Sequence, residues 1–207
     1  MRIRSHRLEH DDGTPYSFMS SHNQGPGSIT PEFLVMHYTA GRDAQSSIAH
    51  LVDADSRASA HLVIGRDGSI TQLVDFDRRA WHAGTSHWDG RDNVNGFSIG
   101  IELDNAGELT GGAGHWRSWF QMPVDDADVL VARHKHGGSE SGWHRFTEAQ
   151  IGAAAEVAGL LVRHYGLRDV VGHDDIAPDR KRDPGPAFPM ASFRSMALGR
   201  ADEGPQR

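Results

Sequence analysis

Hydrophobic and polar residues alternate along several short stretches of this chain, at the two-residue spacing of a half-buried strand. The clearest stretch is GFSIGIEL, which places Ile99, Ile101 and Leu103 on one face of a strand and Ser98, Gly100 and Glu102 on the other. FLVMHYTAG predicts a second strand, with Leu34 and Met36 on one face and Val35 and His37 on the other. AHLVIGRDGSITQLV predicts a hairpin, and LRDVVGH predicts a short strand that ends at His173.

Apolar residues at helical spacing predict two helices. DAQSSIAHLV forms one through Ile48, Leu51 and Val52, and TEAQIGAAAEVAGLLVRHYG forms the clearer one. In the second helix, Thr147 and Gln150 are expected to form a capping box, and Gly166 ends the helix. Strands that alternate with helices predict an α/β fold, with a mixed central β-sheet flanked by helices.

The same patterns divide the chain into segments. Residues 1–30 are polar and turn-rich and predict an N-terminal arm, residues 31–197 predict the folded domain, and residues 198–207 predict a tail. Within the domain, residues 107–143 form a long insertion with many glycines, charges and tryptophans, which predicts a binding loop or a lid. The stretch GHDDIAPDRKRDPGPAFP contains four prolines, so it predicts a stiff loop and not a helix.

Composition narrows the function classes. The net charge is −7, from 21 basic and 28 acidic residues, and no long basic block occurs, which argues against a nucleic-acid partner. No apolar run approaches the roughly 18 residues that span a membrane, so no membrane partner is expected. The chain has no cysteine and 14 histidines, so a metal would have to be held by His, Asp or Glu.

Three polar side chains fall at the carboxyl ends of different predicted strands: His37, Glu102 and His173. Asp183 follows His173 by ten residues. Two imidazoles and one carboxylate are a suitable ligand set for a catalytic Zn²⁺ that keeps one position open, and Glu102 could take a proton from the activated water. Spacing alone leaves other readings open: His37 could be a hydrogen-bonded structural histidine, HDD a solvated turn, and Glu102 the partner of an arginine such as Arg66 or Arg91.

Five motifs in order resemble the zinc-dependent N-acetylmuramoyl-L-alanine amidases related to peptidoglycan recognition proteins. They are VMHYTAG, SAHLVIGRDGSITQLV, AWHAG, SIGIELDN and GHDDIAPDRKRDPGPAFP, and the match runs from about Phe33 to Phe193. The resemblance implies the peptidoglycan recognition protein-like amidase fold and one Zn²⁺ per chain held by His37, His173 and Asp183. It also implies Glu102 as the carboxylate that activates water and Lys181 as the cation that stabilises the oxyanion. The implied reaction is hydrolysis of the amide between N-acetylmuramic acid and L-alanine, with peptidoglycan fragments as the partners.

Further residues are candidates for contacts with such a substrate: His82, Trp88, Trp119 and Arg91. All five tryptophans lie between residues 81 and 143, and two or three of them are expected only to pack the insertion onto the sheet. His61 is expected to be structural. His134 and His136 have no carboxylate at a fixed spacing and are expected to be solvated loop residues.

Two other functions fit the same motifs: a non-catalytic peptidoglycan-binding module, and a zinc hydrolase of another amide substrate. The amino-terminal stretch lacks the apolar run of a secretory signal, which predicts a cytoplasmic enzyme of muropeptide recycling. The alternative is a phage lysin that a holin releases.

Overall fold

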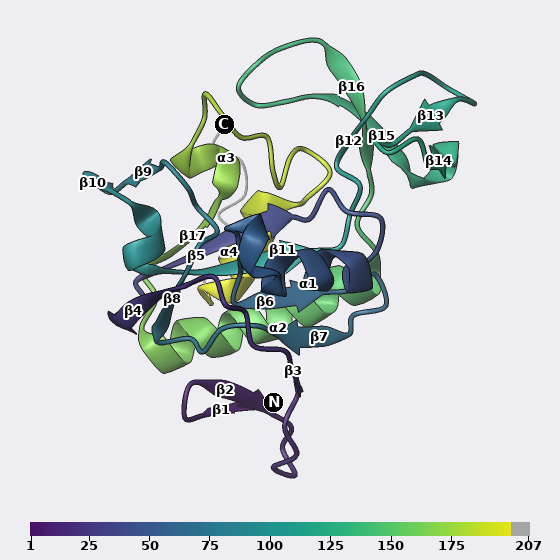
Figure 1. The fold of residues 1–207 in the computed structure, drawn as a ribbon. Coiled ribbons are helices and arrows are strands. Elements are labelled where there is room, and N and C mark those ends of the chain that lie inside the picture. Colours follow the sequence, from purple (N-terminus) through teal and green to yellow (C-terminus); the bar gives the residue numbers. More distant parts are fainter. Residues whose placement is uncertain (200–207) are drawn as a thin grey trace.

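A six-stranded mixed sheet lies at the centre of the computed structural model, which describes residues 1–199 (Figure 1). Its strands run in the order β17 (Asp169–Gly172), β5 (Phe33–Tyr38), β11 (Ser98–Leu103), β6 (Leu62–Ile64), β7 (Ile70–Gln72) and β3 (Ser17–Phe18). The first four strands are parallel, and β7 runs antiparallel to β6 in the predicted hairpin. The carboxyl ends of β17, β5, β11 and β6 therefore share one edge of the sheet.

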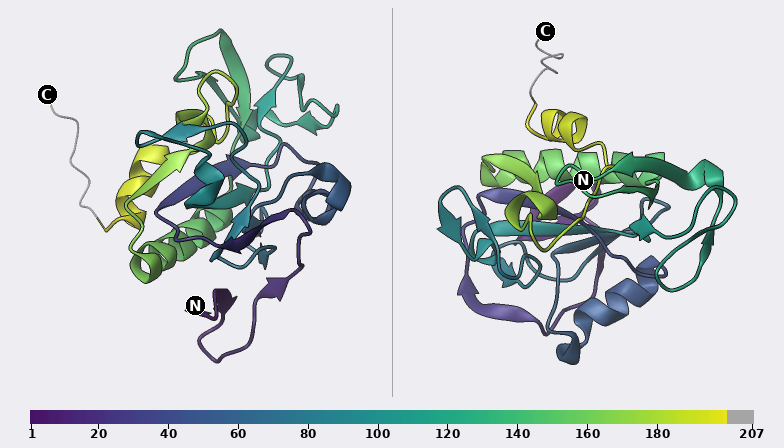
Figure 2. Two further views of the ribbon diagram at one scale, coloured as in Figure 1. Left: turned by 60° about the vertical axis from the view of Figure 1, so that its left-hand side comes forward. Right: turned by 90° about the horizontal axis from the view of Figure 1, so that it is seen from above.

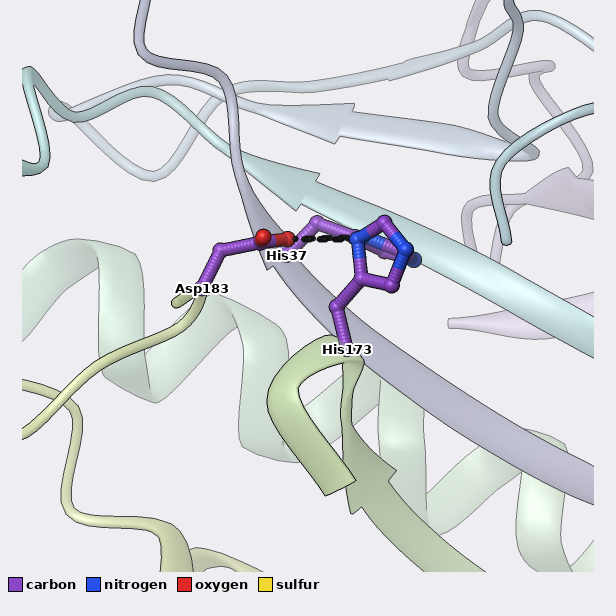
Figure 3. Close-up of side chains that lie close together, drawn as sticks. All are labelled: His37, His173 and Asp183. Carbon is purple, nitrogen blue, oxygen red and sulfur yellow. Dashed lines mark hydrogen bonds and ion pairs between the residues drawn. The ribbon is translucent and has the colours of Figure 1, made fainter. Parts of the chain in front are cut away.

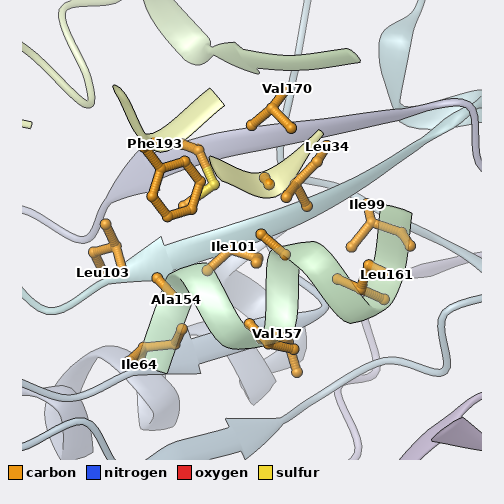
Figure 4. Packing of buried hydrophobic residues seen from close by; sticks show 14 of the residues in the cluster. Leu34, Ile64, Ile99, Ile101, Leu103, Ala154, Val157, Leu161, Val170 and Phe193 are labelled. Atoms are coloured by element: carbon orange, nitrogen blue, oxygen red, sulfur yellow. The ribbon is translucent and has the colours of Figure 1, made fainter. Parts of the chain in front are cut away.

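Helices cover both faces of this sheet (Figure 2). They are α1 (Ala44–Val52), α2 (Glu148–Tyr165), the one-turn α3 (His173–Ile176) and α4 (Met190–Ala197), with short 3₁₀ turns at Ala54–Ser56, Val94–Gly96 and Asp126–Asp128. Helices α2 and α4 pack on the face that carries Leu34, Ile99 and Ile101, which forms the main core (Figure 4). Helix α1 packs on the opposite face with a smaller cluster around Leu51 and Val63. His37 and Glu102 belong to this second face, as the alternation predicted.

The long helix α2 begins and ends at the predicted residues but is capped differently. The Thr147 hydroxyl accepts from the backbone N–H of Gln150, and Gly166 ends the helix in the left-handed conformation, with φ of 67°. The predicted capping box is wrong, because the Gln150 side chain does not reach back to Thr147. It is buried and donates to the carbonyl oxygens of Ile64 and Asp104, both at 3.0 Å, which ties the start of α2 to the ends of β6 and β11.

The first thirty residues contribute strands to the body of the protein. A hairpin of β1 (Arg2–Arg4) and β2 (Arg7–Glu9) buries Leu8 in the main core, and β3 pairs with β7 at the sheet edge. Strand β4 (Gln24–Ser28) pairs with β8 (Arg78–Ala80). The division into arm, domain and tail stays a prediction, and residues 200–207 of the tail lie outside the described residues.

The insertion is more regular than the sequence predicted. It contains a three-stranded antiparallel sheet of β12 (Glu108–Leu109), β16 (Glu140–His144) and β15 (Val129–Arg133), and a short ribbon of β13 (Trp116–Arg117) and β14 (Pro123–Val124). Ala106, Leu109, Trp116, Val124 and Val129 form its own apolar cluster. The segment folds as a small subdomain because it encloses enough apolar side chains to do so.

The proline-containing stretch is not entirely a loop, which corrects the prediction. Strand β17 ends at Gly172, and His173 opens α3, one helical turn that is complete before the first proline, Pro178. From Ala177 to Pro189 the chain is irregular. No helix among the described residues is long and apolar enough to cross a membrane.

Candidate active site

Three side chains meet at the carboxyl edge of the sheet: His37 from β5, His173 from α3 and Asp183 from the loop that follows (Figure 3). The Nδ1 atoms of the two histidines lie 2.9 Å apart, and the Asp183 Oδ2 atom lies 3.1 Å from His37 Nδ1 and 2.9 Å from His173 Nδ1. All three side chains are buried. The structure thus brings together the three ligands that the sequence predicted.

The hydrogen bonds of His173 show which of its two ring nitrogens presents a lone pair to this centre. Its Nε2 lies 3.2 Å from the carbonyl oxygen of Ala83, which can only accept, so Nε2 carries the ring proton. In the neutral ring Nδ1 is then unprotonated. Burial, followed by the charge of His173, lowers the pKa of His37 to about 4, so the His37 ring is neutral at pH 7.

The three converging atoms fit a metal ion. Ligand atoms around a tetrahedral zinc ion with bonds of about 2.0 Å stand roughly 3.3 Å apart, a few tenths of an ångström wider than this triangle. Two imidazole nitrogens and a carboxylate oxygen are also donors that zinc accepts. Although burial raises the pKa of Asp183, its hydrogen bonds with His173 and His37 outweigh that effect and hold the pKa well below its usual range. The group His37, His173 and Asp183 could therefore hold a metal.

Glu102 lies beside this triangle, because it pairs with His37 in the register of β11 and β5. Its Oε2 atom is buried and has no hydrogen-bond partner among residues 1–199. Burial and the negative charge of Asp183 raise the pKa of Glu102 well above its usual value, against a smaller opposing effect of Lys181. An unpartnered carboxylate with a raised pKa is suited to exchange a proton with a molecule at the centre.

Lys181 differs from the two arginines beside it. Arg180 donates to the carbonyl oxygens of Ala83 and Thr85, at 2.7 and 2.9 Å. Arg182 forms a bidentate ion pair with the Glu108 carboxylate. Lys181 has no side-chain hydrogen bond or ion pair within the described residues, yet its charge lowers the pKa of both Glu102 and His37. It is therefore a cation near the centre that pairs with no anion of residues 1–199.

Arg91 and Trp88 already have partners within the protein, and their roles as substrate contacts stay predictions. Arg91 forms a two-fold ion pair with Glu32, at 2.8 and 3.1 Å, and its guanidinium lies 3.9 Å from the Phe97 ring centroid. Glu32 directly precedes β5, so this pair lies at the amino end of the strand whose carboxyl end carries His37. Trp88, in β9 (His87–Trp88), pairs with Arg91 of β10 (Arg91–Asp92) and packs against a buried apolar cluster that includes Ile176 of α3.

The two remaining substrate candidates have different positions. His82, predicted to contact substrate, is only 7% exposed, and its Nδ1 lies 3.0 Å from His37 Nε2. Trp119 is 68% exposed, and its indole N–H donates to the carbonyl oxygen of Ala40 at 2.7 Å. His61 is buried between two backbone groups, accepting from Gly100 N–H and facing the carbonyl of Arg78, as expected of a structural histidine. Trp116 and Trp143 are buried packing residues, also as expected.

The sequence analysis missed a cluster beside His173. His134, predicted to be solvated, is buried, and its Nε2 lies 3.0 Å from Asp174 Oδ2. Lys135 bridges Asp174 and Asp175, and His136 contacts the Asp174 carbonyl oxygen at 2.7 Å. The sequence feature that could have predicted this cluster is the opposite charge of two short runs, HKH at residues 134–136 and DD at residues 174–175. Through these contacts the β15–β16 hairpin holds the turn that carries His173.

A mixed sheet with a buried two-histidine, one-carboxylate centre that could hold a metal, beside a carboxyl group and a lysine that have no protein partner among residues 1–199, is an arrangement suited to a hydrolase. The chain belongs to the N-acetylmuramoyl-L-alanine amidase family, whose sequence profile matches residues 27–186. The predicted family, fold and amidase activity are thereby confirmed.

Individual relatives support this assignment. The chain is 37% identical over 195 residues to the 1,6-anhydro-N-acetylmuramyl-L-alanine amidase AmpD of Escherichia coli strain K12, covering 90% of this chain and 84% of that protein. A crystal structure of an AmpD derivative superposes with a TM-score of 0.67 at 31% identity, covering 95% of this chain and 99% of that one. The amidase AmiD from Escherichia coli was solved in complex with anhydro-N-acetylmuramic acid-L-Ala-D-gamma-Glu-L-Lys. It superposes with a TM-score of 0.63 at 32% identity, and the match covers 84% of this chain and 60% of that one.

Proposed function

We propose that this chain is a zinc-dependent amidase that cleaves small muropeptides between N-acetylmuramic acid and L-alanine. The observation that carries the proposal is the triangle of His37 Nδ1, His173 Nδ1 and Asp183 Oδ2, with edges of 2.9 to 3.1 Å. His37, His173 and Asp183 would hold one zinc ion per chain. When bound, zinc supplies Lewis acidity, which makes a water molecule nucleophilic at neutral pH and polarises a carbonyl group.

Glu102 and Lys181 would divide the remaining chemistry. The unpartnered Glu102 carboxylate takes the proton of the attacking water and later returns it to the leaving amine of L-alanine. The Lys181 ammonium, which has no anionic partner among residues 1–199, stabilises the negative charge that develops on the carbonyl oxygen. Burial of Glu102 suits it to both steps, because a raised pKa makes the carboxylate a better proton acceptor than an exposed glutamate.

The relatives of this chain favour small substrates over polymeric wall. AmpD relatives are named for 1,6-anhydro-N-acetylmuramyl-L-alanine, and we propose the same class of soluble substrate here. This substrate corresponds to a role in muropeptide recycling in the cytoplasm.

Of the residues predicted to contact substrate, we propose that Trp119 does so. Its exposed indole lines a hollow of about 440 Å³ together with Thr39, His50 and Leu51. Thr39 lies two residues beyond His37, so the hollow begins at the carboxyl edge of the sheet, where the ligands meet. An exposed indole face is suited to stack on a sugar ring.

Metal analysis and product analysis test the proposal. Purified protein is expected to hold about one zinc ion per chain, to lose hydrolysis on chelation and to regain it when zinc is added. His37→Ala should lose both zinc and activity. Full activity after chelation would overturn the assignment. A protein that binds muropeptide and zinc but releases no L-alanyl peptide would be a binding module.

Two variants separate the chemistry from metal binding. Glu102→Gln and Lys181→Met should keep zinc and fold, and Lys181→Met should lower kcat by roughly 10²–10³-fold, as removal of an oxyanion donor does. Zinc content and kcat on a defined 1,6-anhydro-muropeptide are the measurements. Loss of zinc from Lys181→Met would instead make Lys181 a structural residue of the loop.

Substrate size is tested on the unmodified protein. We expect a much higher kcat/KM on soluble 1,6-anhydro-muropeptide than on intact sacculi, measured by mass spectrometry of the products. Clearance of sacculi at a rate matching the small-substrate turnover would support a lysin and leave the amidase chemistry in place.

A further inference from the structure

A second buried histidine lies directly behind the proposed ligand His37. The Nδ1 atom of His82 is 3.0 Å from His37 Nε2, and the two rings meet edge to face with centroids 5.1 Å apart. His82 is too buried to contact substrate, and neither the proposed metal binding nor the proposed proton transfer uses it.

The proton positions along this contact follow from a backbone carbonyl. The Ser98 hydroxyl donates its only proton to the Val94 carbonyl oxygen at 2.7 Å. The Ser98 oxygen, 3.2 Å from His82 Nε2, must therefore accept from that nitrogen. With its proton on Nε2, the neutral His82 ring has a lone pair on Nδ1, which accepts from His37 Nε2–H. The proton of His37 is thus held on Nε2, and its Nδ1 is left as a lone pair facing His173 and Asp183.

The strand that carries Glu102 is shaped to hold His82 in place. A Cβ atom at Gly100 would lie 2.5 to 2.8 Å from three atoms of the His82 ring, so only glycine leaves room for it. The backbone N–H groups of His82 and Ala83 both donate to the Asn95 side-chain oxygen, at 3.0 and 2.7 Å. The Ala83 carbonyl oxygen in turn accepts from His173 Nε2, so this one segment contacts both ligand histidines.

We propose that His82, oriented by Ser98, is a positioning residue that fixes the tautomer and ring orientation of His37 so that Nδ1 binds the metal. The inference rests on the proposed zinc site. Partners that accept from the outer N–H of a ligating histidine commonly change metal affinity by about 10–100-fold when they are removed. His82 acts through His37 and does not touch the reacting atoms.

Zinc competition with a chromophoric chelator tests the bond. His82→Leu should weaken zinc binding by about 10–100-fold, whereas His82→Asn, which can place an oxygen where Nδ1 lies, should restore most of the affinity. His61→Leu is the matched control, because His61 is as buried and its ring centroid is 5.8 Å from that of His82, yet it contacts no proposed ligand. Thermal unfolding of each variant checks that it is folded.

The outcomes separate the two proposals. Wild-type protein that binds no zinc would overturn the proposed function. Tight zinc binding by wild type and equally tight binding by His82→Leu would overturn only the role of His82, as would equal weakening by His61→Leu and His82→Leu, because packing would then explain both.

A spectroscopic measurement remains decisive if His82→Leu does not fold. In zinc-loaded wild-type protein with ¹⁵N-labelled histidine, nuclear magnetic resonance should find the His82 proton on Nε2 and the His37 proton on Nε2. In Ser98→Ala the His82 ring loses its acceptor and should show a mixture of tautomers, with weaker zinc binding. A wild-type His82 protonated on Nδ1 would contradict the inference.

Discussion

Single residues on one face of β11 have separate tasks in this site. Ser98 orients His82, Gly100 leaves room for its ring, and Glu102 presents an unpartnered carboxylate beside His37. Their two-residue spacing is the reason that one short strand can serve the proposed metal site and the proposed proton transfer together.

Gly100 gives a prediction at this scale. Gly100→Ala should force the His82 ring to move, because the added methyl group would overlap three ring atoms. We expect a loss of about 1–3 kcal/mol in the free energy of unfolding, as overpacking of a core causes, together with weaker zinc binding. Gly152→Ala is the control: a Cβ there meets no atom within 4 Å and lies in the exposed side of α2. That variant should be neutral or slightly stabilising. Equal behaviour of the two variants in thermal unfolding and zinc competition would contradict the prediction.

At the scale of elements, the insertion braces the loop that carries Lys181 and Asp183. Arg182, between these two residues, forms a two-fold ion pair with Glu108 of β12, at 2.7 and 3.1 Å, and its guanidinium lies 5.2 Å from the Trp143 ring centroid. The β15–β16 hairpin meanwhile holds Asp174 through His134. The described contacts therefore support a brace on the proline-containing loop, whereas the sequence predicted a binding loop or a lid.

Removal of the brace should affect catalysis more than substrate binding. Glu108→Ala leaves Arg182 without its partner, so Lys181 and Asp183 lose part of their restraint, and we expect kcat to fall by about tenfold, which corresponds to 1.4 kcal/mol in the barrier. KM for the soluble muropeptide should change little. Glu140→Ala, an exposed position of the same small sheet, is the matched control and should retain wild-type kcat. The brace has no functional role if both variants have the same kcat.

At the scale of the whole molecule, buried neutral histidines make folding sensitive to acid. Burial lowers the pKa of His61 from 6.5 to about 4, and it lowers the pKa values of His37, His82 and His144 as well. Between pH 6.5 and about 4 the unfolded chain binds protons that the folded chain does not. The contribution of these neutral histidines to the free energy of unfolding is therefore fully present above pH 6.5, and it is lost as the pH falls toward 4.

This dependence is measurable by chemical unfolding with a chelator present throughout, so that metal binding does not contribute. The fully buried His61 should account for at most about 3 kcal/mol of the loss between pH 7 and pH 4. His61→Gln should therefore be less stable than wild type at pH 7 but lose less stability on acidification. His87→Gln is the control, because that side chain is exposed, and it should follow the wild-type slope. An unchanged slope in His61→Gln would show that burial of this ring does not produce the acid sensitivity.

Much of the fold and the grouping of the proposed metal ligands could be predicted from the sequence. Periodicity alone placed β5, β11 and α2, because a strand or helix with one buried face repeats its apolar residues at a fixed spacing. The same spacing placed His37 and Glu102 on one face, and the shared carboxyl edge of parallel strands brought them together with His173. The spacing of residues along the sequence was sufficient to predict these features.

Only the tertiary structure decided which polar side chains pair with one another. His82 contacts a residue 45 positions away, His134 one 40 positions away and Arg91 one 59 positions away, and none of these partners follows a periodic pattern. The Arg91–Glu32 pair and the burial of His134 were not predicted, because the sequence does not show whether a charged or imidazole side chain faces water or a partner within the protein. Burial makes such a partner necessary, since an unpaired polar group inside a protein costs several kcal/mol. Which partner satisfies it depends on how the strands, the loop and the insertion meet in space.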